Sequence, residues 1–125
     1  MLVRCEVITS PVSGEVQAES PWVTVGSEYL VVAILAYMGR QVDLWIVDDS
    51  GEPSVWPMTM FTVVDGRMPP EWEAHDQAGA LVIEPREFWP VGFWERYWER
   101  SREERVLFDD FVKRSIAMHT SDLDR

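Results

Sequence analysis

The hydrophobic pattern of this 125-residue chain changes its period once, close to Pro85. Before Pro85, short runs of Val, Ile, Thr and aromatic residues are interrupted by Gly, Pro, Asp and Ser, which is typical of strands joined by tight turns. After Pro85, apolar residues recur at helical spacing. We therefore expect an α+β fold with a β-rich part (residues 1–84), a helical part (85–118) and a short tail (119–125). A chain of this length fits a single domain, 1–125, with one core.

The β-rich part is expected to hold five or six strands. The candidate runs are residues 2–8, 22–29 (a short strand and a turn at Gly26), 29–38, 41–49, 55–64 and 80–84. Gly39 and Arg40 mark a turn, and the polar stretch 73–79 is expected to be a loop. Pro57 lacks a backbone N–H, so we expect the start of the run 55–64 to be an edge strand or a bulge. Short strands with tight turns favour a small, strongly bent antiparallel sheet or an SH3-like barrel, with C-terminal helices packed on it.

The stretch EPREFWPVGFWERYWER, residues 84–100, concentrates aromatic side chains at the start of the helical part. Helical spacing places four of them on one face, with charged residues on the other: Phe93, Trp94, Tyr97 and Trp98. Ser101 and Glu104 form an S-x-x-E capping box, which predicts a helix starting at Ser101. We expect the aromatic face to pack against the open side of the sheet. Whether there is one bent helix or two stays open.

The net charge of −11 is unevenly distributed along the chain. Residues 1–84 contain 13 acidic residues and three arginines, whereas residues 85–125 are nearly balanced, with nine acidic and eight basic residues. The negative electrostatic field of residues 1–84 repels nucleic acid, because phosphate binding needs Lys and Arg. It attracts a basic partner and speeds the encounter with it. The alternative is that the charge only maintains solubility.

Targeting features are sparse. The N-terminal residues lack the long apolar segment of a secretory signal. The longest apolar run, residues 29–38, has about half of the roughly 20 residues that a membrane helix needs, and we interpret it as a strand buried on both faces. Cys5 is the only cysteine, so no internal disulfide can form. We therefore expect a cytoplasmic protein that does not contact membranes.

Residues that could carry chemistry are few. No glycine-rich phosphate loop is present, and Lys113 is the only lysine. His75 lies among Glu71, Glu73 and Asp76, but a solvated acidic loop explains this cluster better than a metal site does. His119 follows the last apolar positions, where a helix C-terminus stabilises a cationic side chain. We expect no catalytic residues, no metal and no cofactor.

Three segments carry a resemblance to known proteins: SPWVTVGSEYLV (20–31), FTVVDGRMPPEW (61–72) and FWERYWERSREERVLFDDF (93–111). In them the chain is similar to small, acidic, uncharacterised bacterial proteins. These resemble the stand-alone immunity proteins that bacteria encode beside toxins delivered to neighbouring cells. The resemblance implies a cytoplasmic inhibitor, but it assigns a role to no residue.

Three functions remain open. The first is a non-catalytic binding protein, an immunity protein that neutralises a basic toxin, such as a nuclease, by direct contact through an acidic surface. Its predicted contact residues are the acidic turns and an exposed tryptophan as aromatic anchor: Asp48, Asp49, Glu52, Glu71, Glu73 and Asp76, with Trp56 or Trp72. The second is an SH3-like peptide-interaction module with Trp45, Trp56 and Trp72 along one groove. The third is a small-molecule-binding protein or enzyme with an apolar pocket. The oligomeric state stays open.

Overall fold

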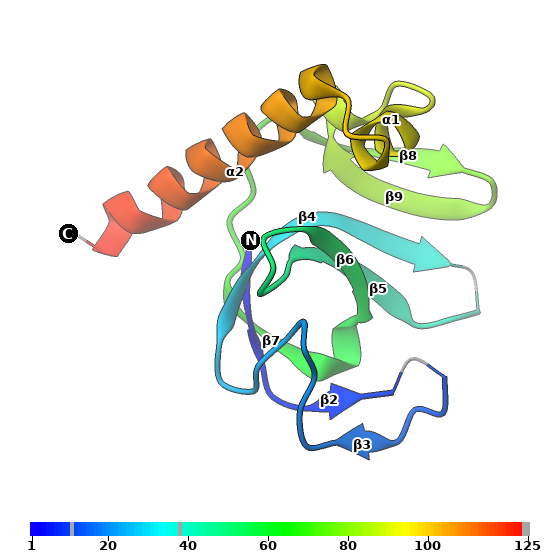
Figure 1. Ribbon diagram of the computed structural model, residues 1–125, viewed down its shortest axis with the longest axis vertical. Coiled ribbons are helices and arrows are strands. Elements are labelled where there is room, and N and C mark those ends of the chain that lie inside the picture. Colours follow the sequence, from blue (N-terminus) through cyan, green and yellow to red (C-terminus); the bar gives the residue numbers. More distant parts are fainter. Residues whose placement is uncertain (11, 38, 124–125) are drawn as a thin grey trace.

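The computed structural model describes residues 1–10, 12–37 and 39–123. Antiparallel strands come first and two helices last, as Figure 1 shows. Five strands form the core of the main sheet, in the order β6-β5-β4-β1-β7. Their bounds are Leu2–Cys5 (β1), Glu28–Tyr37 (β4), Val42–Val47 (β5), Pro53–Pro57 (β6) and Phe61–Asp65 (β7). The hairpin of β8 (Trp72–Gln77) and β9 (Ala80–Pro85) joins this sheet through β4, while β2 (Ile8–Thr9) and β3 (Val16–Gln17) pair separately.

Strand β4 organises the sheet because it has different partners along its length. Its first residues pair with β1, with Leu30 opposite Leu2, and its last residues pair with β9, with Tyr37 opposite Ala80. A register shift between Val31 and Ala33 in the β4–β5 ladder adds a local bend. The sheet therefore curves and divides at β4. The buried stretch of β4 agrees with the strand predicted there, although Met38 lies outside the described residues.

The expected bent antiparallel sheet with C-terminal helices is confirmed, but the sheet is not closed into a barrel. The edge strands β6 and β7 are consecutive in the chain. A 3₁₀ turn, η1 (Met58–Met60), connects them, and each pairs only inward, with β5 and β1 respectively, in the described part of the chain. Within the described residues the main sheet has seven strands, more than the five or six expected.

Three local predictions were wrong. Residues 22–24 are not a strand, although the turn predicted at Gly26 is present, with a φ of 88°. The run 55–64 is two strands, because η1 interrupts it directly after Pro57. The predicted loop 73–79 is mostly strand β8, joined to β9 by Ala78 and Gly79, whose φ angles of 52° and 84° make the tight turn. Its polar residues are compatible with a strand because β8 is an edge strand with much of its surface in water.

Two helices follow the sheet. Helix α1 (Phe93–Trp98) and helix α2 (Arg102–Leu123) are separated by Arg100, whose φ is 67°. Ser101 ends this break as predicted: its carbonyl accepts the Arg105 amide, and its hydroxyl bonds to Glu104 at 3.1 Å. Helix α2 continues through residues 119–123, so the predicted tail is wrong there, and residues 124–125 lie outside the described part.

Both helices bury aromatic rings against the sheet. The rings fully enclosed in the core come from η2 (Arg86–Phe88), α1 and α2: Phe88, Phe93, Tyr97, Phe108 and Phe111. Each such side chain stabilises the fold by about 2–3 kcal/mol on burial. Trp98 is 48% exposed, so its predicted place on the buried face is wrong, although its neighbour Tyr97 is buried.

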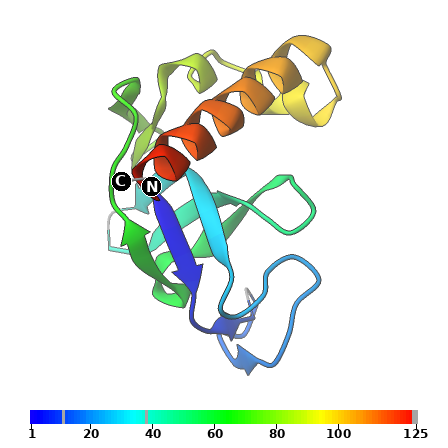
Figure 2. The ribbon, with the colours of Figure 1, turned by 90° about the vertical axis from the view of Figure 1, so that its left-hand side faces the viewer.

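Helix α2 crosses over the sheet, and Figure 2 shows its last turns beside the start of β1. There the His119 ring is buried, with Nδ1 2.7 Å from Asp65 and Nε2 3.4 Å from the Met1 amine. His119 is thus held by tertiary partners within a helix, and not by the helix terminus expected from the sequence. Among the described residues, no helix combines the length and the apolar character needed to cross a membrane.

Candidate functional site

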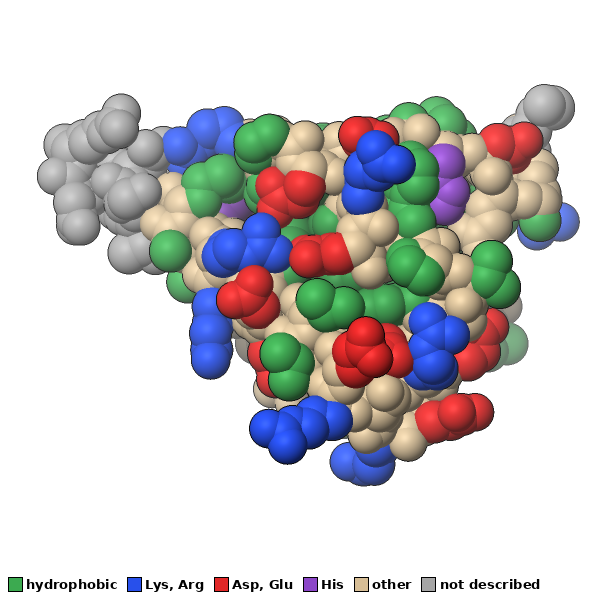
Figure 3. All heavy atoms as spheres, turned by 90° about the horizontal axis from the view of Figure 1, so that it is seen from above, with side chains coloured by type: hydrophobic (Ala, Val, Ile, Leu, Met, Phe, Trp, Pro, Cys, Tyr) green, Lys and Arg blue, Asp and Glu red, His purple; other side chains and the backbone are tan. Residues whose placement is uncertain are grey.

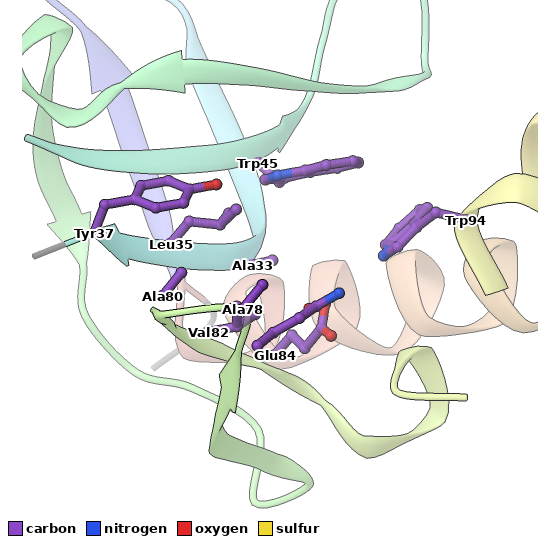
Figure 4. Close-up of a pocket in the computed structure, with 10 residues that line it drawn as sticks. Ala33, Leu35, Tyr37, Trp45, Ala78, Ala80, Val82, Glu84 and Trp94 are labelled. Atoms are coloured by element: carbon purple, nitrogen blue, oxygen red, sulfur yellow. The ribbon is translucent and has the colours of Figure 1, made fainter. Parts of the chain in front are cut away.

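A pocket of about 280 Å³ opens where strands β4, β5 and β9 meet helix α1, as Figure 4 shows. Alternate residues of a strand point to the same face, so β4 and β9 each contribute every second side chain. The lining consists of Ala33, Leu35, Tyr37, Trp45, Gln77, Ala78, Ala80, Val82, Glu84 and Trp94. The alanines at 33, 78 and 80 leave the space that larger side chains would fill. The pocket therefore exists because small residues on the strands lie opposite aromatic residues.

Aromatic side chains form the upper wall of this pocket. The rings of Trp45 on β5 and Trp94 on α1 have centroids 4.9 Å apart and are tilted by 36°. Tyr37, at the end of β4, is 38% exposed and lies at the rim. In Figure 4 these rings surround the space above Leu35 and Ala33. Indole and phenol faces attract cations, and more strongly where water is excluded.

Glu84 supplies the charge of the pocket. It is only 5% exposed, and its Oε1 lies 3.1 Å from Nε2 of His75 on the neighbouring strand β8. Burial raises the pKa of Glu84, while hydrogen bonds from His75 and Trp94 act in the opposite direction. A buried carboxylate with an elevated pKa is a group whose ionised form gains from a cationic ligand. Such perturbed groups in clefts are typical of functional sites.

A second compartment of about 360 Å³ adjoins the first and shares Gln77, Glu84 and Trp94 with it. Its other side is the segment after η2, where the Trp89 ring lies 4.2 Å from the His75 ring and the Trp89 indole donates to the Glu84 carbonyl. The carboxylates of Asp76 and Glu95 complete its polar lining. The two compartments form one cleft, which we call the Glu84 cleft.

The Glu84 cleft depends on a glycine at its second wall. Gly92 begins α1 with a φ of 82°, and a Cβ at this position would lie 2.7 Å from the Arg96 guanidinium. Arg96 is itself held by the Val91 carbonyl at 3.0 Å and by Glu104 at 2.9 Å. These contacts fix the start of α1 and thereby the position of Trp94.

The first acidic turn predicted from the sequence is occupied by contacts within the fold. Asp48 is buried and accepts the Ser50 and Glu52 amides, at 2.9 and 3.3 Å. Asp49 accepts the Tyr29 hydroxyl at 2.8 Å. Glu52 accepts the Tyr97 hydroxyl at 2.6 Å and pairs with Arg105 at 3.2 Å. These three carboxylates therefore order the turn and attach the helices to it.

The second predicted acidic group lies on or beside strand β8. Glu71 pairs with Arg114 of α2 at 2.9 Å, and Glu73 with Arg86 at 3.6 Å. Asp76 differs from them because it lines the Glu84 cleft. Of the predicted contact residues, the structure thus brings only Asp76 to the cleft.

Neither tryptophan predicted as an exposed anchor is exposed. Trp56 is 8% and Trp72 is 9% exposed, so the expectation of an exposed indole was wrong at both positions. Trp72 packs on Phe111, 6.2 Å between ring centroids, whereas Trp56 lines a polar groove of about 390 Å³ with Asp43 and Pro57. Trp45 belongs to the Glu84 cleft, so neither this groove nor the cleft, within the described residues, is lined by all three tryptophans of the peptide-module interpretation.

Sequence reasoning missed Glu84 and Trp94 as site residues. The one local signal was an acidic residue in phase with Ala80 and Val82 at the end of an apolar strand. Among the described residues, no group of three or more His, Cys, Asp or Glu side chains is arranged to hold a metal ion. Comparisons with protein-family models, with curated proteins and with solved structures find no match to this chain.

Proposed function

We propose that this chain is a non-catalytic binding protein for a basic partner protein, and that the Glu84 cleft receives a cationic side chain of that partner. The observation that carries the proposal is the buried carboxylate of Glu84, 5% exposed, at the base of a pocket walled by Trp45 and Trp94. A guanidinium or ammonium group would pair with this carboxylate and contact the indole faces.

The size of the first compartment of the cleft fits one side chain. At about 280 Å³ it lies just below the range of roughly 300–1,000 Å³ that is usual for small-molecule sites. A Lys or Arg side chain places a long apolar stem along Leu35 and Val82 and its charged end near Glu84. Binding would give the ionised carboxylate a partner that compensates for its lost hydration.

Charge supports a protein partner with a basic surface. The net charge of −11 is concentrated in residues 1–84, which include Glu84. On the face formed by α2, acidic and basic side chains alternate (Figure 3), so this face presents no single-sign patch. Steering by the overall field and anchoring in the cleft are therefore separate contributions. With the resemblance to immunity proteins, this supports the inhibition of a basic toxin, such as a nuclease, by direct contact.

A peptide titration tests the proposal. The probe is a capped five-residue glycine peptide with one central arginine, and its neutral control has citrulline in place of arginine. NMR chemical shifts of the Trp45 and Trp94 indole N–H groups report binding. We expect the arginine peptide to bind at least about tenfold more tightly than the citrulline peptide, a difference of about 1.4 kcal/mol.

Two charge variants locate the effect. Glu84→Gln should remove the preference for arginine. Glu103→Gln changes the net charge equally on an exposed part of α2 and should leave the preference within about twofold. Equal binding of the two peptides, or an unchanged preference in Glu84→Gln, would exclude the cleft as a cation site.

A further inference from the structure

The Glu84 cleft is larger than one cationic side chain requires. Its first compartment, of about 280 Å³, and its second, of about 360 Å³, lie on either side of a wall to which Trp94 and Glu84 both contribute. Both compartments are open to solvent and both are lined in part by aromatic rings, Trp45 in the first and Trp89 in the second. A ligand that occupies only the first leaves the second unfilled.

The second compartment has the lining of a second cation site. Beyond the shared Glu84 it contains the carboxylates of Asp76 and Glu95, both on exposed residues at its mouth. The face of Trp89 lies beside them, in contact with the imidazole of His75. These carboxylates give a guanidinium charge partners, beside an indole that His75 and Arg86 already contact.

Two arginines close to this compartment are engaged elsewhere, while His75 in its lining contacts Glu84 at 3.1 Å. Arg86 lies over the Trp89 ring, 5.3 Å from its centroid, and pairs with Glu73. Arg96 is bound to Glu104 and to the Val91 carbonyl. Their charges are balanced by those partners, so Asp76 and Glu95 remain the main charges at the mouth. Glu84, which contacts His75, faces both compartments, and the carboxylates of Asp76 and Glu95 add two further acidic groups to the second compartment.

We propose that the Glu84 cleft binds two neighbouring basic side chains of a single partner segment, one in each compartment. This inference rests on the proposed function and specifies the sequence that the partner presents. In an extended segment, residues i and i+2 point to the same side, about 6.5 Å apart. The two compartments share Gln77, Glu84 and Trp94, so they adjoin directly, and alternate positions of one extended segment suit adjoining compartments. The recognised motif is therefore Arg-x-Arg or Lys-x-Lys.

The test compares peptides of equal length on the full chain. The probes are capped five-residue glycine peptides with arginine at position 2 alone, or at positions 2 and 4. Two independent sites would give a twofold statistical gain, whereas linked binding in adjacent compartments should give at least about tenfold. Spermidine, which carries the charges without a peptide backbone, is the third probe.

Variants separate the two compartments. The double substitution Asp76→Asn with Glu95→Gln should reduce the dibasic advantage to about twofold while one-arginine binding stays within about twofold. The exposed pair Glu99→Gln with Glu103→Gln removes the same charge elsewhere and should preserve the advantage. Indole N–H shifts of Trp89 and Trp94 report occupancy of each side, and the same spectra confirm that every variant is folded.

Each outcome decides one question. A dibasic gain of twofold or less, with one-arginine binding that still requires Glu84, overturns the two-residue inference and leaves the proposed function intact. Failure of both peptides to bind overturns both. Spermidine could bind as tightly as the dibasic peptide, with the same dependence on Asp76 and Glu95. That result would identify a free polyamine as the occupant and overturn the inference that a protein segment binds there.

Discussion

The Tyr97 hydroxyl donates a 2.6 Å hydrogen bond to Oε2 of Glu52, and this contact links helix α1 to the turn between β5 and β6. The Arg105 guanidinium completes the cluster, 4.3 Å from the centroid of the Tyr97 ring and 3.2 Å from Oε1 of Glu52. Burial, together with the Glu52 carboxylate, raises the pKa of Tyr97 well above its usual range. Glu52 thus connects the acidic sheet to both helices.

Tyr97→Phe should lower the free energy of unfolding by about 1–2 kcal/mol, because it removes a buried donor to a charged acceptor and leaves the ring in place. Urea denaturation at neutral pH measures the loss. A double-mutant cycle with Glu52→Gln should show that most of this loss depends on the carboxylate. Additive effects of the two substitutions would mean that the hydrogen bond contributes nothing to stability.

Phe88→Ala should destabilise far more than Trp98→Ala. Phe88 is 2% exposed and contacts four aromatic rings, Phe93, Trp94, Phe108 and Phe111, so its removal leaves a cavity that costs about 3–5 kcal/mol. Trp98 is 48% exposed and should cost under about 1 kcal/mol. Thermal melting of both variants makes the comparison. Comparable losses would show that Trp98 packs more tightly than its exposure indicates.

The sequence was sufficient for the main division of the fold but not for the cleft. The change of period near Pro85, the apolar run that became β4 and the capping box at Ser101 are local signals, so they could be interpreted without tertiary structure. Strand β8 was not predicted because its polar residues Glu73, His75 and Asp76 are typical of a loop, although an edge strand also tolerates such residues. The bent sheet was foreseen, but whether it closes depends on edge pairing, which no local pattern encodes.

The internal contacts of the acidic turns could not be predicted for a related reason. Glu52 and Glu71 looked free because their partners, Arg105 and Arg114, follow more than 40 positions later in the chain. The cleft was missed because four strands and a helix contribute to it. Trp94 in particular was predicted to lie on the core-facing side of the helix, and its contact with Phe88 agrees with this. The helical spacing does not indicate that the Trp94 ring also contacts Trp45.

Asp65→Asn should lower the stability of the fold near neutral pH, and the loss of stability should be smaller in acid. Arg67, and then His119 through a 2.7 Å contact, hold the pKa of Asp65 well below its usual range. A carboxylate with a depressed folded-state pKa contributes stability that is present above its unfolded pKa of about 3.9 and is lost as pH falls below it. Melting temperatures of both proteins from neutral pH down to about pH 2 test this, and the gap should narrow below about pH 4.

The exposed Asp109→Asn is the matched control for Asp65→Asn, and it should melt close to the parent protein throughout. A gap for Asp65→Asn that stays constant through the acid range would show that the loss comes from altered packing around His119. It would then not reflect the charge of Asp65.

Glu84→Gln should stabilise the protein relative to the parent increasingly as pH rises. Burial raises the pKa of Glu84, so the folded state retains a proton that the unfolded state has lost. Stability linked to such a group falls as pH increases from about 4.3, the ordinary value for Glu, through the higher pKa of the folded state. The groups that face Glu84 are His75 and Trp94, with Glu73 opposite it on β8. Urea denaturation of both proteins from about pH 4 to pH 8 gives the difference in unfolding free energy.

The imidazole of His75 is the main confounding group, because it loses its carboxylate partner when Glu84 is replaced. Repeating the comparison in a His75→Asn background removes the imidazole from both proteins. The advantage of Gln at position 84 should persist there and grow with pH, because it comes from the desolvation of the carboxylate. An advantage that is largest in acid and vanishes at neutral pH would mean that the ionised Glu84 is already compensated by its neighbours, and the cleft would then lack the uncompensated charge that its attraction for a cation requires.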